Sequence, residues 1–429
     1  MVSNNYVGFF DTFIDDIHCR VFYPIENEKE FATKRQDLRK SRSSAITYLY
    51  AKYWLVVFLS KFCRIFKFPA VIKFYDKWRY QSVWHKNVFR YSPRNQSIPY
   101  EIDSCLTGCS PFEGGPEKLR YEKTPDQKLL KQMLQNKKGK LIIYHVGVGC
   151  SVETSYTVFC QRLAKETDSI IVCPSFSCGT LLHYFNRKIN QLVEYSFHIP
   201  MYTNSQERKD QNDIRSSETY RITNVLSEIA GGAQNMKIDA VGHSFGGCSV
   251  FHLLADTRAS STFNRIVSLG GSLGVGLTDQ DWQTILKLNY TTKTLQIFED
   301  MYLKDLRQCS IFTRPTLADE RRCNKSNLPY SERKQFGYTI KNCNHCDIFD
   351  YNSQNKKNIR WLDRMQMKLV KMYNENNVDS FENQVFVVTS FLSGVDLRCL
   401  DKNHFVEGVP KFDEIDINKV EASITRLLK

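Results

Sequence analysis

The stretch AVGHSFGG, residues 240–247, carries the strongest fold signal in this chain. It follows a strand-like run at residues 237–241 and precedes a helix-like run from residue 248 to about residue 256. A strand, a G-x-S-x-G turn and a helix in this order lift the serine onto a sharp turn with its hydroxyl exposed. The glycines on either side of Ser244 suit that geometry because the turn is too tight for side chains. The pattern predicts Ser244 as a nucleophile.

Strand-like and helix-like runs alternate around this turn. An antiparallel pair is predicted within residues 4–24, and strands are predicted at 141–146, 169–174, 264–269, 292–298 and 335–340. Helices are predicted at 153–166, 218–230, 356–376, 381–393 and 414–428, a loop-rich connection at 72–135 and a polar, irregular excursion at 177–215. Alternation of this kind predicts an α/β class with a mostly parallel, doubly wound sheet and helices on both faces. We expect one domain over residues 1–429.

The strand, serine turn and helix are the nucleophile elbow of the α/β-hydrolase fold, which we therefore predict. In that fold the base is a histidine on a loop after the last strand, and the chain order is serine, acid, histidine. His345 follows the last predicted strand and is the candidate base. The backbone N–H of Phe245 is expected to bind a developing oxyanion. The turn at residues 147–149, after the first parallel strand, could bring further N–H groups near a substrate.

The acid is the least determined member of the site. The strand that follows the serine turn ends in Leu269-Gly270-Gly271-Ser272, without a carboxylate. The next strand ends in Glu299-Asp300, a suitable place in α/β-hydrolase topology, and these two residues are the first candidates. An exposed acidic loop is the alternative interpretation for both. Further candidates are Asp279, Asp281, Asp347 and Asp350.

Cysteine use does not indicate a metal site. Cys343 and Cys346 flank His345, but two cysteines and one histidine without a second cluster are poor zinc spacing. We predict no metal and no cofactor. Residues 1–10 show neither a basic n-region nor a long apolar h-region, so no secretory signal is expected and the cysteines are expected to be reduced.

Charge and aromatic content point towards an anionic surface. The formal net charge is +13, which favours phospholipid or nucleic acid, yet the cations are dispersed and match no nucleic-acid module. Residues 45–68 are rich in aromatic residues but are interrupted by Lys52, which disfavours a bilayer span. On a helical wheel the cations Lys61, Arg64 and Lys67 fall opposite an apolar side, as in a helix lying in a membrane interface. An ordinary core helix is the alternative. The apolar side includes Trp54, Leu55, Phe58, Phe62 and Phe66.

Several stretches, in the same order along most of the chain, match one known family. They are Val7-Gly8, residues 20–24 (RVFYP), Tyr53-Trp54, residues 141–144 (LIIY), residues 147–149 (GVG), residues 242–247 (GHSFGG) and His345 followed by Asp350-Tyr351. The chain thereby resembles the platelet-activating factor acetylhydrolase family, the group VII phospholipases A2. The GHSFGG stretch matches that family's motif residue for residue, and the other matches are looser.

The resemblance implies a serine esterase that cleaves the sn-2 ester of phospholipids with acetyl or short oxidised acyl chains and needs no calcium. It implies Ser244 as nucleophile, His345 as general base, and the Phe245 and Val148 amides as the oxyanion hole. It also implies that the 45–68 helix contacts membrane and, since intracellular members lack a signal, that the protein is cytoplasmic and peripherally membrane-associated. The oligomeric state is not indicated.

Two departures from the family pattern set the alternatives. The family's acid is an aspartate in a Leu-Asp-Ala-Trp-like segment, and this chain has Gly270 at that aspartate. The family's His-Gly before the oxyanion turn is Val146-Gly147 here, with His145 one place earlier. Either Glu299 or Asp300 has taken the acid's place, or the chain is a catalytically impaired hydrolase fold that binds lipid or a protein partner.

Overall fold

A computed structural model describes the parts of the chain that build the sheet and its covering helices. The described residues are 6–15, 17–25, 131, 133–135, 140–147, 156–174, 176, 178, 183–186, 191–194, 206–271, 277–278, 280–281, 284–285, 292–300, 335–345, 347–348 and 377–407. Outside them lie the predicted membrane-contacting segment 45–68 with its five apolar residues, nearly all of the connection at 72–135, and the predicted helices at 356–376 and 414–428.

The described residues form a central sheet of nine strands. Its strands are β1 (Tyr6–Ile14), β2 (Ile17–Ile25), β3 (Lys140–His145), β4 (Ile170–Pro174), β7 (Lys237–His243), β8 (Phe263–Leu269), β9 (Lys293–Glu299), β10 (Gln335–Ile340) and β11 (Phe405–Glu407). The spatial order is β1-β2-β4-β3-β7-β8-β9-β10-β11, with parallel pairing from β4 through β10. Antiparallel strands flank this parallel part, β1 and β2 at one edge and β11 at the other. A separate hairpin joins β5 (His183–Asn186) to β6 (Gln191–Glu194).

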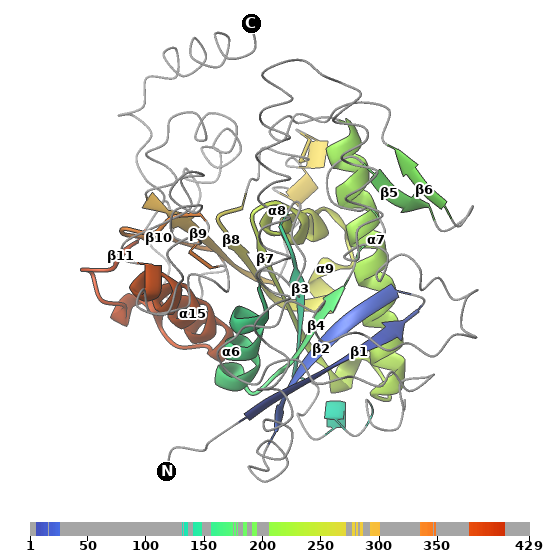
Figure 1. The fold of residues 1–429 in the computed structure, drawn as a ribbon, viewed down its shortest axis with the longest axis horizontal. Helices are drawn as coiled ribbons and strands as arrows, with labels where there is room; N and C mark the ends of the chain where they lie inside the picture. The colour runs from blue at the N-terminus through green and yellow to red at the C-terminus, as the bar shows by residue number, and fades with distance from the viewer. Residues whose placement is uncertain are drawn as a thin grey trace, which may run out of the picture.

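Helices cover both faces of the sheet (Figure 1). On one face lie α6 (Thr157–Thr167) and α15 (Asn377–Ser393), and on the other lie α7 (Gln206–Ile229), α8 (Phe245–His252) and α9 (Ala259–Thr262). Short 3₁₀ turns span Ala233–Asn235 (η4), Leu253–Ala255 (η5) and Leu397–Cys399 (η8). Within the described residues, no helix has both the length and the apolar character needed to cross a bilayer.

The core is two-sided because successive strand residues point to opposite faces. In β3, Ile142 and Tyr144 pack with α6 and α15, whereas Leu141 and Ile143 pack with α7 and α8. All four side chains are buried. This explains the continuous apolar runs of the central strands, which are typical of parallel sheets covered on both sides.

The predicted class and parallel strands are confirmed, and one prediction is wrong. Residues 177–215 are not an irregular excursion, since they contain the β5–β6 hairpin and the start of α7, which begins at Gln206. The reason lies in what α7 buries: polar side chains, among them Arg208, Asn212 and Arg215. An amphipathic pattern signals a helix only when its buried stripe is apolar.

Candidate active site

The serine turn joins β7 to α8. Ser244 lies between them with φ 58° and ψ −124°, a conformation that a non-glycine residue rarely adopts. Its N–H donates to the carbonyl oxygen of Leu269 at 2.9 Å, which ties the turn to the end of β8. Backbone strain of this kind costs roughly 1–3 kcal/mol and persists where the surrounding structure enforces it. The turn therefore holds Ser244 in the strained conformation that the G-x-S-x-G pattern predicts.

The flanking glycines are required by close backbone contacts. A Cβ at Gly242 would overlap the carbonyl group of Gly246, and a Cβ at Gly246 would overlap the carbonyl group of His145. The start of α8 therefore lies directly against the backbone at the ends of β7 and β3. A Cβ at Gly147, just beyond β3, would lie 3.2 Å from the Cβ of Ser244, so the turn after β3 passes beside the serine.

The structure brings His345 to this turn and Glu299 to His345. The ring of His345 lies against that of His243, the residue before Ser244, with centroids 4.5 Å apart. The Nδ1 atom of His345 lies 3.2 Å from Oε2 of Glu299, the last residue of β9. Glu299 is completely buried, whereas the side chain of His345 is 16% exposed. A serine turn, an imidazole and a buried carboxylate therefore lie together at the carboxyl ends of β7, β9 and β10.

Gly270 leaves the space that the carboxylate of Glu299 fills. Gly270 follows β8 with φ 50°, and a Cβ there would overlap the carboxyl group of Glu299. The end of β9 therefore places a carboxylate in the space that a side chain at position 270 would need.

Strand order, serine turn and chain order together decide the fold. The chain has the α/β-hydrolase fold. Its nucleophile position follows a central parallel strand, and the carboxylate and the histidine follow later strands in that order.

Comparisons with known proteins give structural neighbours only. No protein-family model matches the chain, and no curated protein matches it. Among solved structures, a ferulic acid esterase from Streptomyces cinnamoneus is 10% identical over 62% of this chain and 73% of its own, with a TM-score of 0.38. An arylesterase is 10% identical, covering 60% and 75%, with a TM-score of 0.34. A thermophilic carboxylesterase cloned from a metagenomic library is 13% identical, covering 60% and 80%, with a TM-score of 0.33.

The other predicted acids lie elsewhere or bind backbone. Asp300 accepts the N–H of Cys343 at 3.2 Å, and Asp347 accepts the N–H of Asn344 at 2.7 Å. Both carboxylates thus brace the backbone of the loop that carries His345. Asp281 accepts the N–H of Thr278 at 2.8 Å, on the side of the sheet that α7 and α8 cover. Asp279 and Asp350 lie outside the described residues.

The thiol of Cys343 packs against α15. Gln384 donates to its Sγ at 3.1 Å, and burial is the main cause that raises the pKa of this thiol well above its ordinary value. Cys346 lies outside the described residues.

His243, Glu299 and His345 offer a different set of possible metal ligands. One ligand atom from each lies within 4.8 Å of the others. The two rings are inclined by only 31°, so their in-plane lone pairs pass one another rather than converge on one ion. The Nε2 atom of His243 also lies 2.9 Å from the carbonyl oxygen of His345, which can only accept a hydrogen bond. The arrangement fits hydrogen bonding better than metal coordination.

The turn after β3 is held from the α7 side. Arg215, which is 2% exposed, donates from one guanidinium nitrogen to the carbonyl oxygen of Val146 at 2.8 Å. His145 is also buried there, 3.0 Å from the hydroxyl of Thr219, and burial followed by the charge of Arg215 lowers its pKa well below the usual value. His145 therefore faces α7 and not the serine. Val148, the predicted second oxyanion donor, lies outside the described residues.

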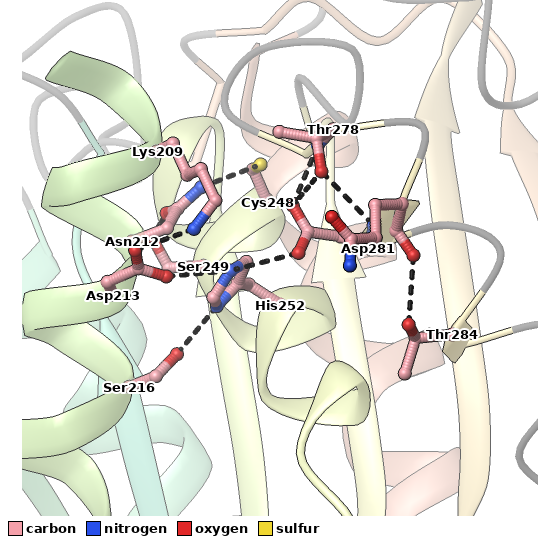
Figure 2. A network of polar contacts seen from close by, with 11 residues as sticks. Lys209, Asn212, Asp213, Ser216, Cys248, Ser249, His252, Thr278, Asp281 and Thr284 are labelled. Carbon is pink, nitrogen blue, oxygen red and sulfur yellow. Dashed lines mark hydrogen bonds and ion pairs between the residues drawn. The ribbon is translucent and has the colours of Figure 1, made fainter. Parts of the chain in front are cut away.

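Sequence reasoning missed a second group of serine, histidine and aspartate. Figure 2 shows His252 of α8 between α7 and Asp281. Its Nδ1 lies 2.9 Å from the hydroxyl of Ser216, and its Nε2 lies 3.3 Å from Asp213 and 3.9 Å from Asp281. Ser216 is inside α7, where backbone N–H groups are used by the helix and none is free to stabilise an oxyanion. This group joins α7 to α8 and does not form a second catalytic site.

Proposed function

We propose that the protein is a serine carboxylic ester hydrolase in which Ser244 is the nucleophile, His345 the general base and Glu299 the acid. The observation that carries the proposal is the 3.2 Å contact between His345 and the buried Glu299, beside a serine in a strained turn. A carboxylate at Nδ1 fixes the tautomer that leaves Nε2 free to accept a proton, and it stabilises the imidazolium that then forms.

Each proton in the proposed reaction has a place to go. The Ser244 oxygen attacks the ester carbonyl while His345 takes the hydroxyl proton, and the resulting oxyanion accepts hydrogen bonds from backbone amides. When the intermediate collapses, the ester bond breaks and His345 gives its proton to the departing alcohol. Water then attacks the acyl-serine with His345 again as base, releasing the carboxylic acid and restoring the serine. Glu299 exchanges no proton in this scheme; it only orients His345.

Two backbone amides are proposed as the oxyanion hole. Phe245 is the first residue of α8, and the first N–H groups of a helix have no acceptor within that helix. The N–H of Gly147 donates to the hydroxyl of Tyr156 at 3.3 Å and so is already used. This supports the next amide, that of Val148, as the second donor.

For the substrate we propose the short-chain sn-2 ester of a phospholipid such as platelet-activating factor, bound at a membrane surface. The support is the family resemblance, above all the GHSFGG stretch, with the net charge of +13 and the aromatic, basic segment at 45–68. A protein of this charge is attracted to anionic lipid surfaces.

Labelling and turnover test the proposal together. A fluorophosphonate probe should label the wild type but not Ser244→Ala, and the wild type should release the short acyl group from such a phospholipid. Glu299→Gln should lower kcat by about 10³- to 10⁴-fold, as expected when a neutral side chain replaces the triad acid. Asp300→Asn is the matched control and should keep most of the activity.

Each outcome separates one interpretation from the others. Cleavage of p-nitrophenyl acetate without phospholipid cleavage would retain the esterase and reject the lipid substrate. Equal rates for the wild type and Ser244→Ala, with no labelling, would leave the binding-only interpretation.

A further inference from the structure

A chain of hydrogen bonds runs behind the serine turn through Tyr156 and His243, which have no role in the reaction proposed above. The N–H of Gly147 lies 3.3 Å from the hydroxyl oxygen of Tyr156. That hydroxyl lies 2.8 Å from Nδ1 of His243, and Nε2 of His243 lies 2.9 Å from the carbonyl oxygen of His345. Tyr156 and His243 are both completely buried.

The acceptors fix the direction of every bond in this chain. A carbonyl oxygen only accepts, so Nε2 of His243 carries a proton and donates to His345. In a neutral imidazole Nδ1 is then an acceptor, and the hydroxyl of Tyr156 donates to it. The same hydroxyl oxygen accepts the N–H of Gly147. Donation therefore runs without conflict from Gly147 to Tyr156 to His243, and separately from His243 to His345.

The neutral state of His243 is supported by its surroundings. Burial, followed by the nearby imidazole of His345, lowers its pKa well below the ordinary histidine value. The carboxyl group of Glu299 is too far away to form a close ion pair with His243, since Oε1 lies 3.9 Å from Nε2. His243 is thus held neutral in one tautomer, with its proton on Nε2.

The chain connects two loops that start far apart in the sheet. The turn at Gly147 follows β3, whereas His345 follows β10, and β7, β8 and β9 lie between those strands. The His345 loop reaches back across the ends of β9 and β8 to meet the end of β7. Asp300 braces an earlier residue of this loop, Cys343, and the backbone carbonyl of His345 accepts a hydrogen bond from His243.

We propose that Tyr156 and His243 are positioning residues, an inference that rests on the proposed esterase function. They fix the turn after β3, which precedes the proposed oxyanion donor, and the backbone of His345 relative to the end of β7. Neither touches the reacting atoms in this scheme. They set where the imidazole and the oxyanion amides lie relative to Ser244.

Tyr156→Phe tests this with little change of volume, and Tyr144→Phe is the matched control. Tyr144 is also buried, and its ring lies 5.3 Å from that of Tyr156, but it has no part in the hydrogen-bond chain described above. With p-nitrophenyl acetate, Tyr156→Phe should lower kcat by about 10- to 100-fold with little change in KM, because misplacement by about 1 Å is enough for such a loss. Tyr144→Phe should keep the wild-type kcat.

Two substitutions of His243 separate its two bonds. An asparagine amide falls near Nδ1 and can still accept from Tyr156, whereas a glutamine amide falls near Nε2 and can still donate to His345. His243→Gln should therefore keep more kcat than His243→Asn. The imidazole proton resonance of His345, recorded by NMR on the full chain, should shift in Tyr156→Phe, which keeps the aromatic ring, and stay in place in Tyr144→Phe.

The resonance is read without any substrate, so it distinguishes failure of this inference from failure of the esterase function. An active wild type whose Tyr156→Phe variant keeps both kcat and the His345 resonance would overturn the inference. An inactive wild type with the shifted resonance would overturn the esterase function and leave the positioning role in place.

Discussion

Glu299 occupies the space that a side chain at position 270 would fill. The glycine and the glutamate lie on neighbouring strand ends, β8 and β9, and the carboxylate reaches His345 across that gap at 3.2 Å. A side chain at position 270 and the observed position of the Glu299 carboxylate therefore exclude one another. Gly270 is thus part of what allows Glu299 to reach His345.

Gly270→Ala should damage activity more than stability. The added methyl group would overlap the Glu299 carboxyl group, and the alanine would have to adopt a φ of 50°. We expect kcat to fall by about 100-fold as the carboxylate is displaced, and the free energy of unfolding to fall by roughly 1–2 kcal/mol. Ester turnover and urea unfolding measure the two effects.

Gly231→Ala is the control for the backbone alone. Gly231 also has positive φ, 85°, but its added Cβ would be 3.5 Å from Asn235, an ordinary contact. This variant should lose similar stability and keep the wild-type kcat. Equal kcat in both variants would mean that the position of Glu299 does not matter for catalysis.

At the scale of residues, pattern alone predicted Ser244, His345 and the pair Glu299-Asp300 as site residues, and the structure brings Ser244, His345 and Glu299 together. The pattern could not choose between the two carboxylates, because neighbouring residues at a strand end point in different directions and only packing shows which one faces the imidazole. Tyr156 and His243 were missed for a related reason. Their role depends on contacts between residues 87 and 102 positions apart, which no local motif encodes.

Among the elements, the central strands were the most predictable and α7 the least. Strands buried on both faces are continuous apolar runs, whereas α7 buries arginine, asparagine and glutamine side chains that break the helical apolar pattern. Short edge strand β11 was also missed, since Phe405–Glu407 has too few residues for an alternating pattern. The elements that support the site through polar contacts are thus the ones that patterning misses.

Arg215 is the clearest case of such support from α7. It donates to the carbonyl oxygen of Val146, and its guanidinium lies over the ring of Phe245 at 4.8 Å from the centroid. Arg215→Lys keeps the charge but loses the planar group. We expect the free energy of unfolding to fall by about 2–3 kcal/mol, the cost of disrupting a buried charged hydrogen bond, with a several-fold lower kcat because the turn before Val148 is released.

Arg221→Lys on the same helix is the matched control. Arg221 is 40% exposed and pairs with Asp15 at the surface, where such pairs are worth about 0–1 kcal/mol. Urea unfolding and ester turnover of this variant should match the wild type. The same small change in Arg215→Lys would contradict a role for α7 in holding the turn.

For the whole molecule, stability depends on ionisable groups that the fold buries away from the site. Asp239 lies near the start of β7, at the opposite end of the strand from Ser244, and pairs in register with Arg265 of β8. Its Oδ1 has no hydrogen-bond partner among the described residues, and the guanidinium of Arg265 is 3.8 Å from Oδ2. Burial raises the pKa of Asp239 to about 7, and the attraction of Arg265 only partly opposes this.

The raised pKa of Asp239 determines the sign of its pH effect. Between the unfolded pKa near ~3.9 and the folded value of about 7, the native state binds the proton more tightly, so stability falls as pH rises through this window. Asp239→Asn is uncharged throughout. Its free energy of unfolding relative to the wild type should therefore rise by about 1 kcal/mol per pH unit from pH 5 to pH 7 and level off above.

Asp256→Asn is the control, since the hydrogen bond with Arg258 lowers the pKa of Asp256, which stays ionised in this window. Urea unfolding at pH 5, 6, 7 and 8 measures both differences, and a flat difference for Asp239→Asn would show that its carboxyl group ionises in the folded protein as it does in the unfolded chain.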